Sequence, residues 1–522
     1  MNASRAIGTI SILTLISKVT GFAREMVIAG SYGAGVATDA FRVAQGIPSL
    51  FFTSIGTALA TVLIPIFTQN LKEGGKDKAF SFARKLTTIT LVITGGLSLF
   101  GVVAAPWVVR IFAPGFSGQA YDLSVQLTRI LFPGLLFTVL AYLATGILQS
   151  LGQFTVPALT GLPMNVIVIA VVLFIGSKFG IYALAWSTLA GLLFQYLIQC
   201  PSLHKRGYRF YWRFDLQDPS IRQVGKLITP VILGTAILQI NTLVSRMVAS
   251  NLPAGSISVL DYCNKLTGLV TGIIITAVGV VALPKFSQLA VSEKRGELAS
   301  LAGQVLSALN VLIIPMAVGL AVLRVPIVRF VYERGAFTPQ DTKLTALALL
   351  FGSVGLVGIG MREIAARAFY ALKDTLTPMV NGIIAMIVNA VLLFLFVGRL
   401  NWGIAGMASA SSCSVLLSGV ILTVLLNRKL GSIGLRSFLG SFWRSCAAAA
   451  IMAVVIYKLY PILDVAILGA GFLAQAMELC LTIIVGVIVY IVVLTLLQSK
   501  EAQYGWASLG GAAKKIHQKK TS

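Results

Sequence analysis

Long apolar stretches without a single charged residue recur along this chain. They cover residues 86–109, 130–177, 298–323, 375–398, 400–427 and 479–499. A helix that spans a bilayer needs about 20 apolar residues. Most of these stretches can therefore hold one spanning helix each, and the longest can hold two. All of them are much longer than the alternating strands of a membrane barrel, which run to ~10 residues.

Applied to the whole chain, the length rule predicts an all-α polytopic membrane protein with about 14 transmembrane helices. We place these helices at residues 6–30, 37–69, 82–110, 124–149, 155–177, 180–202, 221–249, 257–285, 298–323, 342–372, 376–398, 402–427, 437–460 and 467–497.

The composition agrees with a membrane protein and excludes other classes. Of the 522 residues, 57% are hydrophobic and only 11% are charged, whereas soluble domains carry about 25% charged residues. Disorder requires low hydrophobicity and is excluded as well. The 41 Lys and Arg residues exceed the 17 Asp and Glu residues by 24. These cations punctuate the apolar stretches instead of clustering on a soluble face, so we expect no nucleic-acid partner.

The positive charge is distributed unequally between the two sides of the predicted bundle. Loops on the N-terminal side, together with both tails, hold 25 cations, the opposite loops hold 8, and 8 fall inside predicted helices. Cytoplasmic loops are enriched in Lys and Arg. We therefore expect both termini in the cytoplasm, with most of the net charge marking topology. Charged residues interrupt the first apolar stretch, and no small-residue cleavage site follows it, so we expect no cleavable signal peptide.

An internal repeat relates the two halves of the chain. The pattern P-x-F-[ST]-Q begins at Pro65 and again at Pro284, and four further matches recur at offsets of 220 to 223 residues. Six helices per copy make the two lobes parallel, and a substrate site is then expected between them near mid-membrane. We expect an N-lobe at 1–203, a basic linker at 204–220, a C-lobe at 221–430, two further helices at 431–498 and a basic tail at 499–522.

Several charged residues fall inside the predicted helices, where each costs roughly 2.5–3.5 kcal/mol at the bilayer centre. Asp39 and Arg42, three residues apart, can pair with each other, and Glu25 lies two turns beyond Lys18 on the same helix face. The spacing also allows the pairs Asp261–Lys265 and Glu363–Arg367.

Three of the buried cations have few acids to neutralise them. Lys18, Arg24 and Lys265 lie at corresponding depths in the first two helices of each lobe. Lys and Arg side chains are suited to phosphate. A cationic cavity of this kind favours an anionic substrate over cationic drugs.

Motifs for covalent chemistry and for cofactors are missing from the sequence. We find no Walker A loop, no G-x-S-x-G and no paired acid–base motif. The five cysteines are scattered and the two histidines lie in a loop and a tail. We therefore expect a transporter rather than an enzyme, with no cofactor and no metal site. Two alternatives stay open, an ion-coupled small-molecule exporter and a non-transporting scaffold.

Short strings of residues resemble those of a known family. The N-terminal strings are Gly21-Phe22-Ala23-Arg24-Glu25, Gly33-Ala34-Gly35 and Ala37-Thr38-Asp39-Ala40-Phe41, and later ones are Gly255-Ser256-Ile257-Ser258 and Tyr332-Glu333-Arg334-Gly335-Ala336-Phe337. From about residue 5 to 430 the chain resembles the MurJ (MviN) lipid II flippases of the multidrug/oligosaccharidyl-lipid/polysaccharide exporter superfamily.

The resemblance implies a monomeric protein of the bacterial inner membrane that moves a lipid-linked anionic substrate to the outer leaflet by alternating access. It implies functional cations at Lys18, Arg24 and Lys265 and acids at Glu25 and Asp39. It also implies a groove for the polyprenyl tail at helices 13 and 14.

The chain departs from the family pattern in helix 2. Residues 49–57 carry no charge where Arg and Glu are usual, and we expect Arg42 to replace the lost cation. Some members of the family bind sodium through acids of helices 7 and 11. Here helix 7 has Ser245 and Arg246 and helix 11 has no acid, so we expect no sodium site. Another polyprenyl-linked oligosaccharide therefore stays open as an alternative cargo.

Overall fold

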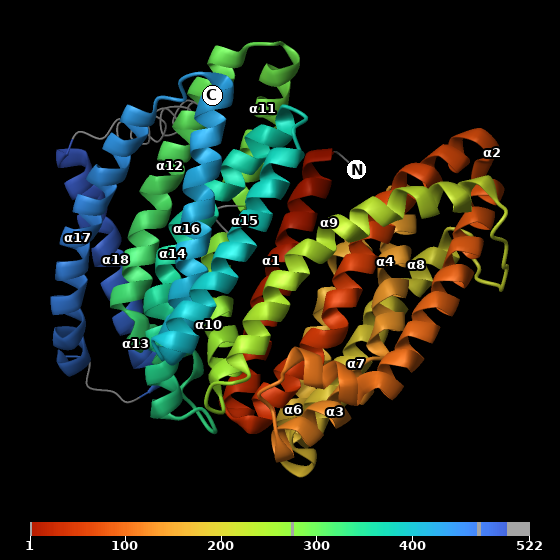
Figure 1. Ribbon diagram of the computed structural model, residues 1–522, viewed down its shortest axis with the longest axis horizontal. Coiled ribbons are helices and arrows are strands. Elements are labelled where there is room, and N and C mark those ends of the chain that lie inside the picture. Colours follow the sequence, from red (N-terminus) through yellow and green to blue (C-terminus); the bar gives the residue numbers. More distant parts are fainter. Residues whose placement is uncertain (1–2, 273–275, 467–470, 498–522) are drawn as a thin grey trace, which may run out of the picture. The chain divides into compact units, whose positions relative to one another are not determined.

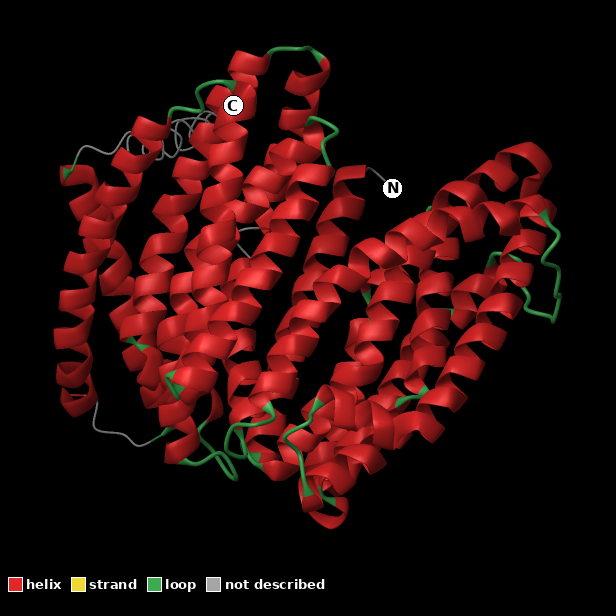
Figure 2. Cartoon of the chain, in the orientation of Figure 1, coloured by secondary structure: helices red, strands yellow, loops and turns green. Residues whose placement is uncertain are grey.

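The structure is a computed structural model that describes residues 3–272, 276–466 and 471–497. Within these ranges the chain forms helices and connecting loops, with no strand (Figure 2). Ten of the helices are long and apolar enough to cross a membrane. The predicted all-α membrane fold is confirmed, while the count of 14 helices and the repeat stay predictions.

The chain divides into two compact units, of which the first comprises Met1–Ser258 and Arg334–Asp341. Its helices, labelled in Figure 1, are α1 (Ala3–Tyr32), α2 (Val36–Phe112), α3 (Gly118–Leu131), α4 (Gly134–Ser150), α5 (Thr155–Ala158), α6 (Gly161–Phe179), α7 (Ile181–Leu197), α8 (Cys200–Lys205) and α9 (Pro219–Ala249).

The second unit comprises Val259–Glu333 and Thr342–Ser522. It contains most of α10 (Ser256–Val270) and of α14 (Pro339–Ala371), both of which begin in the first unit. Its other helices are α11 (Thr276–Val291), α12 (Arg295–Val322), α13 (Arg324–Tyr332), α15 (Leu376–Leu393), the π-helical turn η2 (Phe394–Arg399), α16 (Gly403–Leu430), α17 (Leu435–Ala466) and α18 (Phe472–Leu496).

Glycine and proline interrupt the helices at two places, one between two predicted helices and one inside a predicted helix. Helix α2 is not straight, because Gly74 and Gly75 adopt non-helical backbone angles and divide it into two arms. This turn lies between the helices predicted at 37–69 and 82–110. The helix predicted at 124–149 is divided into α3 and α4 just before Pro133, whose ring cannot continue the hydrogen-bond ladder of the preceding turn.

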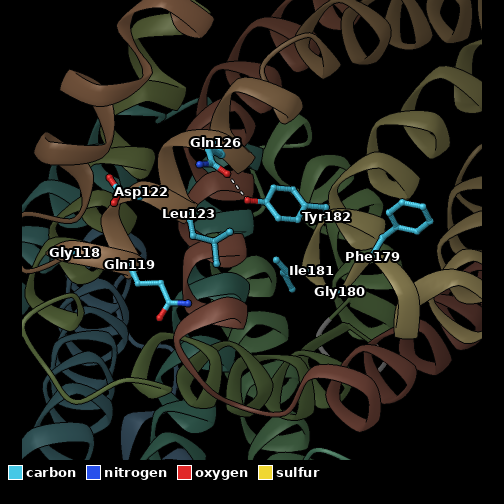
Figure 3. A pocket seen from close by; sticks show the side chains of 9 residues that line it. All are labelled: Gly118, Gln119, Asp122, Leu123, Gln126, Phe179, Gly180, Ile181 and Tyr182. Atoms are coloured by element: carbon cyan, nitrogen blue, oxygen red, sulfur yellow. Dashed lines mark hydrogen bonds between the residues drawn. The ribbon is translucent and has the colours of Figure 1, made fainter.

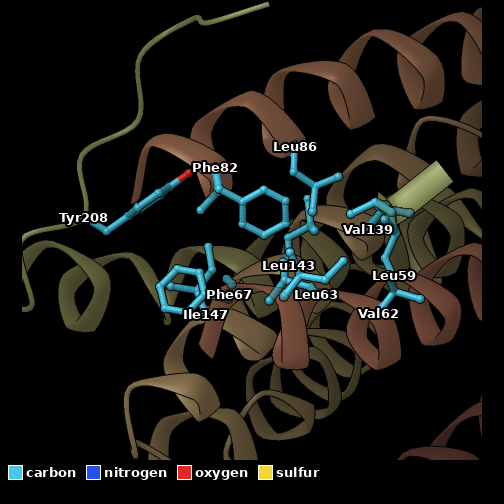
Figure 4. Packing of buried hydrophobic residues seen from close by; sticks show 14 of the residues in the cluster. Leu59, Val62, Leu63, Phe67, Phe82, Leu86, Val139, Leu143, Ile147 and Tyr208 are labelled. Atoms are coloured by element: carbon cyan, nitrogen blue, oxygen red, sulfur yellow. The ribbon is translucent and has the colours of Figure 1, made fainter. Parts of the chain in front are cut away.

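The core of the first unit forms between the two arms of α2 and helix α4. Phe67 and Phe82, one on each arm, are fully buried there together with Leu143 and Ile147 of α4 (Figure 4). Lipid tails are as apolar as these side chains, so the gain comes from van der Waals packing rather than from removal from water. The packing fixes the arms of α2 against α4.

Glycines allow the end of α1 and the segment at Gly335 and Ala336 to approach each other closely. The amide of Ala336 donates a hydrogen bond to the carbonyl oxygen of Gly30 at 2.7 Å. Gly335 has a φ of +57°, and a Cβ at this position would lie 2.2 Å from the same oxygen. A Cβ on Gly33, with φ +62°, would lie 2.4 Å from the carbonyl oxygen of Ala336. No larger residue fits at either position.

We expect Gly335→Ala to lower the thermal stability of the purified protein more than Gly180→Ala. Both glycines have a positive φ, but a Cβ on Gly180 meets no atom within 4 Å. Each variant pays a left-handed strain of about 1–2 kcal/mol, and only Gly335→Ala adds a clash with Gly30, worth roughly 1–3 kcal/mol. Equal losses of Tm would show that the close approach is unimportant.

Candidate functional site

A buried carboxylate joins two guanidinium groups at the centre of the predicted site. Oε1 of Glu25 accepts a hydrogen bond from Nη2 of Arg24 at 2.9 Å, and Oε2 accepts one from Nη2 of Arg42 at 2.7 Å. The side chains of Glu25 and Arg42 are 3% and 4% exposed, and that of Arg24 is 16% exposed. Arg24 is thus the most accessible member of this cluster.

Asn165 of α6 binds the other terminal nitrogen of the Arg24 guanidinium. Its Oδ1 accepts a hydrogen bond from Nη1 of Arg24 at 3.1 Å, while its Nδ2 donates to the carbonyl oxygen of Ser17 and to Oγ1 of Thr20, both at 3.1 Å. The amide of Asn165 therefore links α6 to α1 and holds the guanidinium of Arg24 in place.

The Arg24–Glu25–Arg42 cluster carries a net charge of +1 in a nearly dry environment. Removing one partner of a buried ion pair costs about 3–5 kcal/mol, because the remaining charge is left uncompensated. The carboxylate of Glu25 therefore stabilises both guanidinium groups of this cluster.

The cavity beside this cluster is very small. It has a volume of about 10 Å³ and is lined by Arg24, Glu25 and Arg42 together with Gln45 and Thr188. A single water needs roughly 10–15 Å³. This cavity is therefore too small for a ligand larger than a water molecule.

Asp39 lies at the start of α2 and contacts the first turn of α10. Its Oδ2 accepts from the amide of Gly255 at 2.6 Å, and its Oδ1 accepts from the amide and hydroxyl of Ser258 at 2.8 and 2.6 Å. The carboxylate thus satisfies amides that have no partner within the helix and complements its dipole. A role for Asp39 in binding cargo stays a prediction.

The two remaining candidate residues are exposed. Lys18 lies on α1 in the first unit, and Lys265 lies on α10 in the second unit. Their roles stay predictions, as do those of the buried cluster.

The pairing of the buried charges differs from the expected pattern. Arg42 pairs with Glu25 of α1 rather than with Asp39. Among the residues that the structure describes, Glu363 forms its ion pair with Arg362, at 3.7 Å, and not with Arg367. Spacing along one helix predicts only pairs within that helix, whereas Arg42 of α2 pairs with Glu25 of α1.

Sequence reasoning missed two residues of this region. Asn165 is neutral, so neither charge nor spacing indicates it. Arg246 of α9 is a cation inside a predicted helix, and its Nη1 donates to the carbonyl oxygen of Arg42 at 3.2 Å. A Cβ on Gly46 would overlap this guanidinium. One of the matches of the internal repeat aligns Arg246 with Glu25, 221 residues earlier, and this match is a signal for Arg246 in the sequence.

A larger pocket of about 580 Å³ lies elsewhere in the first unit (Figure 3). Helix α3 contributes Asp122 and Gln126 to its lining, and the start of α7 contributes Tyr182, whose hydroxyl is hydrogen-bonded to Gln126. None of the six candidate residues lines it. The chemistry expected of the chain therefore points to the charged cluster and not to the larger pocket.

Comparisons with known proteins find relatives that match most of this chain. The family model described as "Lipid II flippase MurJ" matches residues 28–464. The lipid II flippase MurJ of Burkholderia cenocepacia is 31% identical over 438 residues, which cover 82% of this chain and 84% of that protein. A probable lipid II flippase MurJ of Vibrio cholerae is 31% identical and covers 79% of this chain and 81% of its own length.

Solved structures also resemble this chain. A lipid II flippase MurJ in an inward closed conformation matches with a TM-score of 0.77 and 25% identity, covering 93% of this chain and 98% of that one. An inward-facing multidrug transporter of the MOP superfamily matches with a TM-score of 0.66 at 16% identity, over 82% of this chain and 98% of that one, and shares the fold alone. Taken with the match over residues 28–464, the chain belongs to the MurJ family.

Proposed function

We propose that this protein is a flippase that moves lipid II, a polyprenyl-diphosphate-linked precursor, from the inner to the outer leaflet of a bacterial inner membrane. The observation that carries this proposal is the buried Arg24–Glu25–Arg42 cluster, with two cations and one acid in a helical bundle. Its net positive charge suits a diphosphate, and relatives that match most of this chain are named lipid II flippases.

In this proposal Arg24 contacts the diphosphate. Its planar guanidinium can donate two parallel hydrogen bonds to phosphate oxygens. It is more exposed than Arg42, and Asn165 holds it in place. Lys18 and Lys265 supply further positive charge to the head group, and Asp39 and Arg42 support the site.

The closed cavity beside Arg24 requires the protein to open before a sugar-linked diphosphate can bind. A volume of about 10 Å³ has no room for such a group. Alternating access by two lobes, at 1–203 and 221–430, supplies that opening. The helices at 431–498 then accommodate the polyprenyl tail, and both termini lie in the cytoplasm. The protein acts as a monomer and performs no covalent chemistry.

A complementation experiment tests the cargo. A bacterium depleted of its own lipid II flippase is expected to keep its shape and to grow when it expresses this chain. Binding of the purified protein to lipid II, compared with another polyprenyl-diphosphate glycan, separates the alternative cargoes. Failure to complement, together with tighter binding of the other glycan, would contradict lipid II as the cargo. Drug efflux without complementation would favour a small-molecule exporter.

We expect Arg24→Gln to abolish complementation and to weaken lipid II binding by roughly 10- to 100-fold, the equivalent of about 1.5–3 kcal/mol for a hydrogen bond to a charged group. Lys178→Gln serves as the matched control, because it removes an exposed cation at the end of α6. Comparable membrane insertion of both variants must be verified by immunoblot. Normal growth with Arg24→Gln would remove Arg24 from the mechanism.

Asn165→Ala is expected to weaken lipid II binding by a few-fold, the equivalent of about 0.5–1.5 kcal/mol for one hydrogen bond. Since Asn165 acts through Arg24, the double variant with Arg24→Gln should bind no more weakly than Arg24→Gln alone. A double-mutant cycle measures this coupling. Additive losses would show that Asn165 contributes independently of Arg24.

A further inference from the structure

The segment that connects α8 to α9 exposes an unusual row of aromatic side chains. Phe210, Trp212 and Phe214 are 37%, 67% and 60% exposed, and Leu216 continues the row at 54%. Their spacing of two residues is that of one face of an extended chain. The rings of Phe210 and Trp212 contact each other with centroids 5.8 Å apart. We call residues 209–216 the aromatic strip.

Hydrogen bonds fix the aromatic strip to the second arm of α2. Nε of Arg84 donates to the carbonyl oxygen of Arg209 at 2.8 Å, and Nη1 donates to the hydroxyl of Tyr211 at 2.7 Å. The amide of Arg213 donates to Oγ1 of Thr88 at 3.1 Å. The strip is thus held along its length as a built surface.

Both ends of the aromatic strip are anchored as well. Before it, Tyr208 is buried in the core, where its ring lies 5.7 Å from that of Phe80 (Figure 4 shows the position of Tyr208). After it, Nζ of Lys85 lies 2.7 Å from carboxylate oxygens of both Asp215 and Asp218. The hydrogen bond from Lys85 lowers the pKa of the Asp215 carboxyl below its ordinary value.

The residues of α2 that contact the aromatic strip indicate its depth in the membrane. Arg84 and Lys85 are the last charged residues before the uncharged stretch 86–109, and Thr88 lies at the start of that stretch. One turn further along, Val92 and Ile93 are 53% and 55% exposed, as expected of side chains that face lipid. The aromatic strip therefore lies at the border between water and hydrocarbon, where Trp and Tyr are enriched in membrane proteins.

The cations of the strip complete the surface. Arg209 and Arg213 are exposed, and Lys205 is exposed just before them. Over the described ranges of the chain, the carboxylates of Asp215 and Asp218 are paired with Lys85, and no acid lies within 4.0 Å of the guanidinium of Arg209 or Arg213. Exposed guanidinium groups beside exposed aromatic rings match the phosphate and acyl parts of an anionic lipid.

We propose that the aromatic strip is a binding surface for anionic phospholipids of the adjacent leaflet. Phe210, Trp212 and Phe214 insert at the level of the head groups, while Arg209 and Arg213 contact lipid phosphates. This surface anchors the segment between α8 and α9 to the membrane surface. The inference concerns bulk lipid and does not depend on the identity of the transported cargo.

Fluorescence quenching in nanodiscs tests this inference. The contribution of Trp212 is obtained by subtracting the signal of Trp212→Phe, in discs that contain brominated phosphatidylglycerol or brominated phosphatidylcholine. We expect both lipids to quench Trp212, and phosphatidylglycerol to quench it more strongly. In Arg209→Gln/Arg213→Gln the preference for phosphatidylglycerol should fall by up to roughly fivefold per cation removed.

Lys72→Gln/Lys76→Gln is the matched control, because it removes two exposed cations from the turn between the arms of α2. We expect it to keep the preference. The inference would be overturned if aqueous iodide quenches the fluorescence of Trp212 and neither brominated lipid does. That result would indicate a solvated segment. An undiminished preference in Arg209→Gln/Arg213→Gln would overturn it too, as would a preference that appears only when lipid II is added. Equal elution profiles of all variants verify that the fold is retained.

Discussion

A charge inside a membrane bundle has to be compensated by other groups of the protein, and in the first unit Glu25 does this for two cations. Its two carboxylate oxygens each accept from a different guanidinium. Because Arg24 and Glu25 lie on α1 and Arg42 lies on α2, the same contacts hold these helices together. Asn165 adds α6 to the arrangement. The hydrogen bonds that satisfy these two guanidinium groups thus connect α1, α2 and α6.

A second buried carboxylate performs a similar task for the backbone. Asp39 accepts hydrogen bonds from amides at the start of α10, and Gly33 and Gly335 permit the segments around it to approach closely. These residues are up to about 300 positions apart in the sequence, yet they belong to the family strings. The strings therefore record a packing constraint at the end of α1 as well as any contact with cargo.

The sequence predicts those features that depend on local pattern and length. The apolar stretches and the break near Gly74 are visible because the helix period and the bilayer thickness are fixed, whereas the break at Pro133 lies inside a helix that was predicted to be continuous. Partners across helices are not visible in this way. Spacing suggested Arg42 with Asp39, but the structure pairs Arg42 with Glu25. Asn165 carries no charge, so nothing in the pattern marked it as the residue that orients Arg24.

The proposed transport cycle also gives Glu25 a reason to be present. Without Glu25, Arg24 and Arg42 would lose the carboxylate that they share, and an uncompensated buried charge costs several kcal/mol. In the proposed cycle Glu25 stabilises the cluster when no cargo is bound and competes with the diphosphate for Arg24. The free energy of diphosphate binding is then reduced by the loss of the Arg24–Glu25 ion pair, which favours release of the cargo. In this proposal the Glu25 carboxylate, shared by two guanidinium groups, combines a stable state without cargo with reversible binding of the diphosphate.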